Sequence, residues 1–187
     1  MKKVIFAIAL LISTSAVFGQ KVLTKNGKVH FDATSPNSPE KIDATNDKTM
    51  SVIDASTGAI EFALLMKAFS FEKALMQEHF NENYVESDKF PKASFKGTIT
   101  NMSSIDLKKD GSYPATVKGQ MTLHGETKEI SATGNITVKG GSITAAKSEF
   151  SLMLADYKIE VPSVVKDKVS KEAKITVDLS FQPMAAK

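Results

Sequence analysis

The chain has 187 residues, a length that suits one domain with a substantial core. It contains no cysteine, which excludes a disulfide framework, a thiol nucleophile and a cysteine-ligated metal site. All 24 basic residues, against 21 acidic ones, are lysine, so the chain lacks the planar guanidinium group that binds guanine or phosphate through two parallel hydrogen bonds. We therefore expect no nucleic-acid partner.

The N-terminal segment has the three-part pattern of a secretory signal peptide. Lys2 and Lys3 precede an apolar run over residues 4–12, and small residues follow up to Gly19. The run is shorter than the roughly 20 residues that a membrane-spanning helix needs, and no later stretch is long and apolar enough. The sequence predicts cleavage after Gly19, a single domain over residues 20–187, and a periplasmic or secreted protein without a transmembrane segment.

Apolar and polar residues alternate over most of the remaining chain, which indicates strands with one buried and one solvated face. Such strands are typical of antiparallel sheets. Over residues 142–155, the apolar phase shifts from Ile143 and Ala145 to Phe150, Leu152 and Leu154, and a β-bulge is the simplest explanation. In chain order, we predict strands at residues 28–33, 42–54 (in one or two pieces), 59–69, 94–100, 115–123, 128–138, 142–155 and 173–181.

Short connections between these segments favour sequential pairing. The pairs Asp110-Gly111 and Gly140-Gly141 are typical of β-hairpin turns, and Gly58 and Gly125 mark two more turns. About eight strands joined in this way predict an all-β protein, an antiparallel up-and-down barrel.

Two segments break the alternation. Residues 72–80 place Leu75, Met76 and Phe80 at helical spacing, which predicts a short amphipathic helix. Residues 161–169 repeat valines at roughly helical spacing, although β-branched residues are weaker helix formers. We therefore expect one or two short helices beside the barrel.

The sequence offers little for catalysis. His79, next to Glu78 on the predicted helix, is the only candidate for a metal or acid–base role, and a structural, hydrogen-bonded histidine near the barrel mouth is the favoured interpretation. His124 precedes Gly125, and a role in a turn is favoured there. We predict no catalytic residues, no metal and no cofactor, and hence a protein that is not an enzyme.

The composition of the interior leaves two interpretations open. Nine phenylalanines and seven methionines follow residue 19, and such side chains suit a cavity for a flexible apolar molecule, or simply fill the core. Gly97, Gly119 and Gly134 fall in the apolar phase of three strands, where they either leave room for a guest or permit the strands to bend.

Three motifs resemble the YceI-like family of exported bacterial proteins. They are residues 79–97, residues 119–128 and residues 154–159, and the resemblance extends over roughly residues 27–181. In the third motif, Asp156-Tyr157-Lys158 stands where Asp-Phe-Gly is common in the family. The resemblance implies a lipocalin-like antiparallel barrel that holds a long isoprenoid chain, such as a polyprenol or a quinone tail, without catalysis.

Because side chains alternate between the two faces of a strand, the apolar positions then predict which side chains face the bound isoprenoid chain, the guest. Three residues of the predicted helix would close one mouth: Leu75, Met76 and Phe80. The predicted lining consists of Phe62, Leu64, Met66, Phe95, Met121, Leu123, Ile130, Phe150, Leu152, Ile175, Val177 and Leu179. The alternative is a filled barrel that serves as a structural or protein-interaction module of the cell envelope, and a homodimer stays open in either case.

Overall fold

The computed structural model describes residues 21–184, so the predicted signal peptide lies outside the described residues. Long strands account for most of this range, as the alternating sequence predicts. The strands are β1 (Lys21–Thr34), β2 (Asp43–Asp54), β3 (Ala59–Leu65), β4 (Lys92–Ile99), β5 (Gly111–Leu123), β6 (Glu126–Lys139), β7 (Ser142–Met153), β8 (Val169–Ser180) and β9 (Gln182–Pro183).

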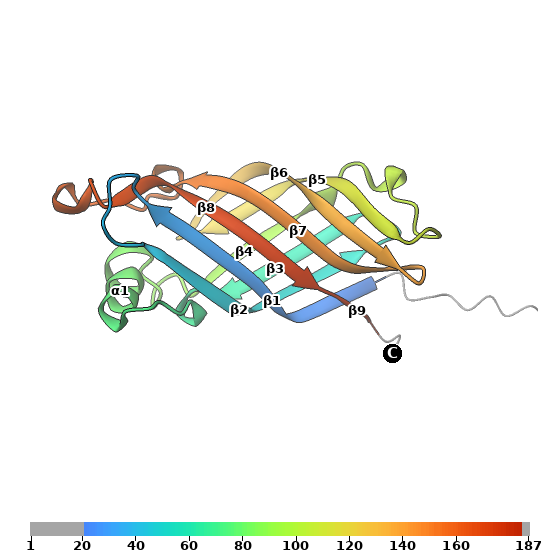
Figure 1. Cartoon of the computed structure of the whole chain (residues 1–187), viewed down its shortest axis with the longest axis horizontal. Coiled ribbons are helices and arrows are strands. Elements are labelled where there is room, and N and C mark those ends of the chain that lie inside the picture. Colours follow the sequence, from blue (N-terminus) through green and yellow to red (C-terminus); the bar gives the residue numbers. More distant parts are fainter. Residues whose placement is uncertain (1–20, 185–187) are drawn as a thin grey trace, which may run out of the picture.

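Consecutive strands from β1 to β8 pair in antiparallel fashion, and β8 pairs back onto β1 (Figure 1). This pairing closes the sheet into an eight-stranded barrel, and β9 adds a short pairing to the start of β1. Because the side chains of a strand alternate between its two faces, closure puts one apolar face of every long strand inside. The predicted antiparallel up-and-down barrel is confirmed.

All helical elements except η3 gather at one end of the barrel, which we call the α1 end (Figure 1). Helix α1 (Ala74–His79) continues into a π-helical turn, η2 (Phe80–Tyr84). Three 3₁₀ turns, η1 (Met66–Ala68), η4 (Leu154–Tyr157) and η5 (Ser163–Val165), follow or precede strands at the same end, whereas η3 (Met102–Ser104) lies at the other. Within residues 21–184, no helix is long and apolar enough to cross a membrane.

The predicted β-bulge is found in β7, but it lies before Ala145 and not after it as the sequence suggests. Thr137 of β6 pairs with Ala145, but the next residue, Val138, pairs with Ile143, so Thr144 is an extra residue in β7. The bulge exchanges the inward and outward positions along the strand, which explains the shift of the apolar phase.

Three local predictions are wrong. The strand predicted at 59–69 ends at Leu65, because the chain turns through η1 before Phe69 reaches the core. Residues 161–169 form no α-helix: only η5 is helical, and Val169 already belongs to β8. Asp110-Gly111 makes no tight hairpin, since residues 100–110 form a longer connection that includes η3, and Gly111 begins β5.

Two groups of buried side chains divide the interior along the barrel axis. The group near the α1 end includes Phe31, Met66 and Phe95 and leaves many side chains only partly buried. The group at the opposite end includes Ile53 and Ile143, which are almost completely buried. The barrel is therefore tightly packed at the end away from α1.

Candidate functional site

An apolar cavity of about 630 Å³ occupies the barrel between its packed end and the α1 end. Inward-facing residues of all eight long strands line it, together with residues of α1 and η4. Its volume lies within the range of 300–1,000 Å³ that is typical of small-molecule sites. The interior of this barrel is hollow.

All fifteen residues that the sequence predicts as lining or closing residues lie around this cavity. Met66 lies there although it belongs to η1 and not to a strand. Whether these side chains contact a bound molecule stays a prediction. They are Phe62, Leu64, Met66, Leu75, Met76, Phe80, Phe95, Met121, Leu123, Ile130, Phe150, Leu152, Ile175, Val177 and Leu179.

Several inward-facing side chains are only partly buried. Ile130, Phe150, Ile175 and Val177 line the cavity and still have accessible surface, whereas a filled core would bury such residues almost completely. Each of them has apolar surface left to cover. The site can therefore gain free energy when an apolar molecule fills it.

A cluster of four phenylalanines narrows the cavity at the α1 end. Phe80 of η2 stacks on Phe31 of β1 with ring centroids 5.3 Å apart, and it meets Phe71 at 5.0 Å and Phe69 at 5.7 Å. The sequence predicted Phe80 at this mouth but missed its three partners. The alternation of Val29, Phe31 and Ala33 was the signal that could have found the contribution of β1.

Polar lining residues occur in two places. At the mouth, Lys73 Nζ donates a hydrogen bond to the Glu40 carboxylate, and this bond lowers the pKa of Glu40 below its ordinary value. Lys168, His79 and Tyr84 of η2 also line the cavity at this end, and burial raises the pKa of the Tyr84 hydroxyl. The second place is the junction of β6 and β7, where the lining residues are Thr133, Gly134, Asn135, Lys147 and Ser148. Between the two places the walls are apolar.

The strands β6 and β7 are paired over only part of their length. Their pairing begins where Lys139 faces Ser142 and ends where Gly134 faces Ser148. Beyond that point β6 pairs only with β5, and β7 pairs only with β8. The turn η4 contacts β6, β7 and β8 there, with Tyr157 and Ile159 buried. The turn η4 thus adds to the cavity wall where β6 and β7 are not paired with each other.

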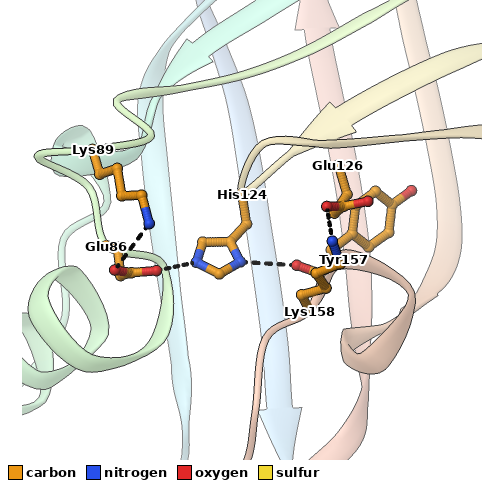
Figure 2. A network of polar contacts seen from close by, with 6 residues as sticks. All are labelled: Glu86, Lys89, His124, Glu126, Tyr157 and Lys158. Atoms are coloured by element: carbon orange, nitrogen blue, oxygen red, sulfur yellow. Dashed lines mark hydrogen bonds and ion pairs between the residues drawn. The ribbon is translucent and has the colours of Figure 1, made fainter.

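A histidine fixes η4 in place. The ring of His124, in the turn between β5 and β6, lies between two partners in Figure 2. Its Nδ1 donates to the carbonyl oxygen of Tyr157 at 2.9 Å, and its Nε2 lies 2.9 Å from Oε2 of Glu86, in the loop after η2. Both contacts are hydrogen bonds at once when each ring nitrogen carries a hydrogen. His124 therefore joins three separate loops at the α1 end.

A second ion pair supports the same segment. Lys158 Nζ, just after η4, lies 2.6 Å from Oε1 of Glu126 at the start of β6 (Figure 2). The hydrogen bond from Lys158 lowers the pKa of Glu126. Tyr157 itself is 1% exposed, and burial raises the pKa of its hydroxyl. The end of η4 is thus attached to the β5–β6 hairpin at two consecutive residues, Tyr157 and Lys158.

A family model described as the YceI-like domain matches residues 5–181 of the chain. The match extends over nearly the whole sequence. The chain belongs to the YceI-like family. No protein with a curated description matches the sequence.

Solved structures show the same fold at low sequence identity. A polyisoprenoid binding domain from Saccharophagus degradans, implicated in plant cell wall breakdown, superposes with a TM-score of 0.73 at 12% identity, covering 89% of this chain and 99% of that one. BcnA from Burkholderia cenocepacia superposes with a TM-score of 0.64 at 12% identity, and the match covers 81% of this chain and 94% of BcnA. The YceI protein of Campylobacter jejuni superposes with a TM-score of 0.53 at 13% identity, and the match covers 76% of this chain and 86% of that protein. These likenesses establish the barrel fold of the YceI-like chain.

The three YceI-like motifs of the sequence meet at His124. Glu86 comes from the first motif, His124 from the second, and Tyr157 and Lys158 from the third. Within the described residues, the non-glycine positions with a left-handed backbone are Glu86, His124 and Lys158, at φ values of 44°, 49° and 53°. This conformation favours glycine, which accounts for the glycine common in the family where this chain has Lys158.

The predicted turn role of His124 is confirmed, and the structure adds a cross-linking role. We expect His124→Asn to lower the free energy of unfolding by about 2 kcal/mol, because both imidazole bonds are lost, one of them to a carboxylate. Asparagine tolerates the left-handed backbone, so the loss of stability comes from the missing imidazole ring and not from a disturbed turn. Urea unfolding of the wild type and the variant measures it.

His30→Asn is the matched control for this prediction. His30 is partly exposed and makes one short side-chain hydrogen bond, between Nδ1 and Thr45 Oγ1 at 3.0 Å. We expect a loss below about 1 kcal/mol there. Equal losses in the two variants would contradict the cross-linking role of His124.

The alternative role of His79 finds no support in its surroundings. Its side chain is exposed on α1 at the cavity mouth, and within residues 21–184 no group of three or more His, Asp or Glu side chains could hold a metal ion. The mouth position agrees with the favoured interpretation of the sequence. The hydrogen bond expected for a structural histidine is not found among the described residues.

Proposed function

We propose that this YceI-like chain is an exported, non-catalytic binding protein that holds a long isoprenoid chain, such as a polyprenol or a quinone tail, inside the barrel. The observation that carries the proposal is the hollow interior of about 630 Å³ with apolar walls. Burial of each methylene group contributes about 0.8 kcal/mol, so a long chain binds tightly without any polar contact. The polyisoprenoid binding domain of Saccharophagus degradans, which has the same fold, supports this class of guest.

The distribution of polar side chains supports binding without chemistry. Polar groups lie at the mouth and at the β6–β7 junction, while the middle of the cavity offers aliphatic and aromatic side chains. These side chains supply neither a nucleophile nor a general acid or base. The signal-peptide pattern of residues 1–19 supports export to the periplasm or beyond.

The cavity also favours a carrier over the filled-barrel alternative. A structural module gains stability from complete packing, and each void costs it contacts. Here the packed group around Ile53 fills one end only, and Ile130 and Phe150 keep accessible surface inside the barrel. One chain supplies all of these walls, so the proposed binding requires no second subunit.

Mass spectrometry of organic extracts from the purified protein tests the proposal. We expect one class of long apolar chain in near-stoichiometric amount from the wild type, and at most a tenth of that amount from Met121→Asp, because a carboxylate in the wall must be desolvated by the guest. Met121→Leu keeps the wall apolar at a similar volume and is expected to retain the chain.

Met66→Asp repeats the test on η1, on a different part of the wall. Circular dichroism shows which variants are folded. Unchanged lipid content in both folded aspartate variants would count against this lining. A wild-type protein that yields no apolar chain, and takes up no geranylgeraniol from cyclodextrin, would overturn the carrier function.

A further inference from the structure

The connection between η4 and β8, residues 158–168, projects beyond the strands at the α1 end and presents an apolar side chain to water (the red segment at the left of Figure 1). Val164 in η5 is 88% exposed, the highest value among the large apolar side chains of residues 21–184. It follows Pro162, which is also exposed. A valine in this position contributes nothing to the core of the protein.

The same connection lies at the cavity mouth. Val165, next to Val164, lines the cavity, and so does Lys168 at the end of the connection. The exposed tip and the opening of the apolar interior are therefore neighbours in the chain. A surface that covered Val164 would lie against the mouth.

Lysines outnumber carboxylates at this tip. Residues 21–184 carry as many acidic residues as lysines, but residues 158–168 carry Lys158, Lys166 and Lys168 against Glu160 and Asp167, and Lys171 follows near the start of β8. Lys166, Lys168 and Lys171 are exposed, and within the described residues none of them forms an ion pair. An apolar tip among lysines matches the interface of an anionic bilayer, where apolar side chains enter the acyl region and lysines contact head groups.

We propose that residues 158–168 dock the cavity mouth onto the surface of an anionic lipid bilayer, with Val164 inserted between the lipids. The inference rests on the proposed function, since it supplies the route by which an insoluble guest passes between membrane and barrel. A guest that moves through a mouth placed against the bilayer is not exposed to water on the way, which avoids the cost of hydrating its apolar surface.

The opposite rim of the mouth is a poorer fit to such a surface. Leu75 on α1 is 60% exposed, but residues 72–79 carry two exposed glutamates, Glu72 and Glu78, against one lysine, Lys73, which is already paired with Glu40. Carboxylates are repelled by anionic head groups, so contact through residues 158–168 is favoured and α1 is turned away from the lipids. The distribution of charge therefore favours contact of residues 158–168, and not of α1, with the bilayer.

Flotation of the mature protein with lipid vesicles tests the docking surface. We expect binding to vesicles of phosphatidylethanolamine and phosphatidylglycerol and much weaker binding to vesicles of phosphatidylcholine alone. Val164→Ser is expected to weaken binding to the anionic vesicles about tenfold. Lys166→Gln is expected to weaken it about fivefold, with no effect on phosphatidylcholine.

Met50→Ser is the matched control, because Met50 is 54% exposed on β2 and lies outside the 158–168 connection. It is expected to bind vesicles as the wild type does. Equal binding by the wild type and Val164→Ser would overturn the proposal. So would a wild type that binds neither kind of vesicle, and the exposed tip would then fit a protein partner better.

Uptake of geranylgeraniol separates this proposal from the carrier function. From cyclodextrin, which needs no membrane contact, Val164→Ser is expected to take up the alcohol at the wild-type rate. From anionic vesicles its uptake is expected to be about tenfold slower. A wild type that binds vesicles but takes up no guest from either donor would refute the carrier function and leave the docking surface standing.

Discussion

Gly119→Ala is expected to destabilise the barrel by about 3 kcal/mol, the largest stability loss that we expect from one added methyl group in this chain. Gly119 of β5 lies directly opposite Gly97 of β4. A Cβ atom on Gly119 would stand 2.3 Å from the carbonyl oxygen of Lys96 and 2.4 Å from the Cα of Gly97. Both are backbone atoms of the neighbouring strand, so relief requires the two strands to separate.

Gly111→Ala is the control on the same strand. A Cβ on Gly111 meets only the ring of Tyr113, at 3.5 Å, which is an ordinary contact. Alanine also reduces the conformational freedom of the unfolded chain, so this variant is expected to be neutral or up to about 0.5 kcal/mol more stable. Urea unfolding monitored by circular dichroism gives both values. A loss below 1 kcal/mol for Gly119→Ala would show that β4 and β5 are farther apart than in the structure.

These glycines show what the sequence interpretation missed. The sequence places Gly97, Gly119 and Gly134 in the apolar phase of their strands, which indicates room for a guest or freedom to bend. The structure adds a third reason, because an added Cβ on each would collide with a backbone oxygen of the adjacent strand, at 2.2–2.3 Å. How closely two strands approach depends on their register and coiling, and the pattern of one strand contains neither.

The lining residues could be predicted because each strand has only one apolar face. Once the strands close into a barrel, parity alone decides that Ile175, Val177 and Leu179 point inward and that Lys174 points outward. Parity cannot show whether the space between inward residues is filled. That depends on how the side chains of different strands interlock, and the sequence left both outcomes open for this reason.

The valines of residues 161–169 misled for a different physical reason. Their spacing suggests one helical face, but the structure distributes them over η5, β8 and the loop before η5, which have different surroundings. Val161 and Val165 pack against the core of the α1 end, Val164 is exposed in η5, and Val169 pairs with Thr34 in the sheet. A periodic pattern that continues across an element boundary carries no information about that boundary.

The partners of His124 could not be predicted from local patterns at all. Glu86 and the Tyr157 carbonyl lie 38 and 33 residues away along the chain. The turn at Gly125 was visible in the sequence, but the contacts of the ring depend on the closure of the whole barrel. The resemblance to the YceI-like family marked the three motifs as important without indicating that they meet.

Val177→Phe is expected to weaken the binding of geranylgeraniol about 60-fold while the barrel stays folded. Val177 on β8 lines the cavity and packs against both buried groups, so it lies between the packed end and the mouth. A phenyl ring in this place would displace about three methylene groups of the guest. At about 0.8 kcal/mol for each, the loss is about 2.4 kcal/mol, or roughly 60-fold in the dissociation constant.

The same ring is expected to stabilise the empty protein, because filling a void restores contacts that its walls lack, with a typical gain of about 0.5–2 kcal/mol. Thr176→Phe places the same ring on the adjacent residue, which does not line the cavity, and is expected to leave binding unchanged. Titration with geranylgeraniol from cyclodextrin measures affinity, and urea unfolding measures stability. Weaker binding together with higher stability would identify the cavity as the site of the guest, because damage to the fold lowers both. Undiminished affinity in Val177→Phe would place the guest outside the middle of the barrel.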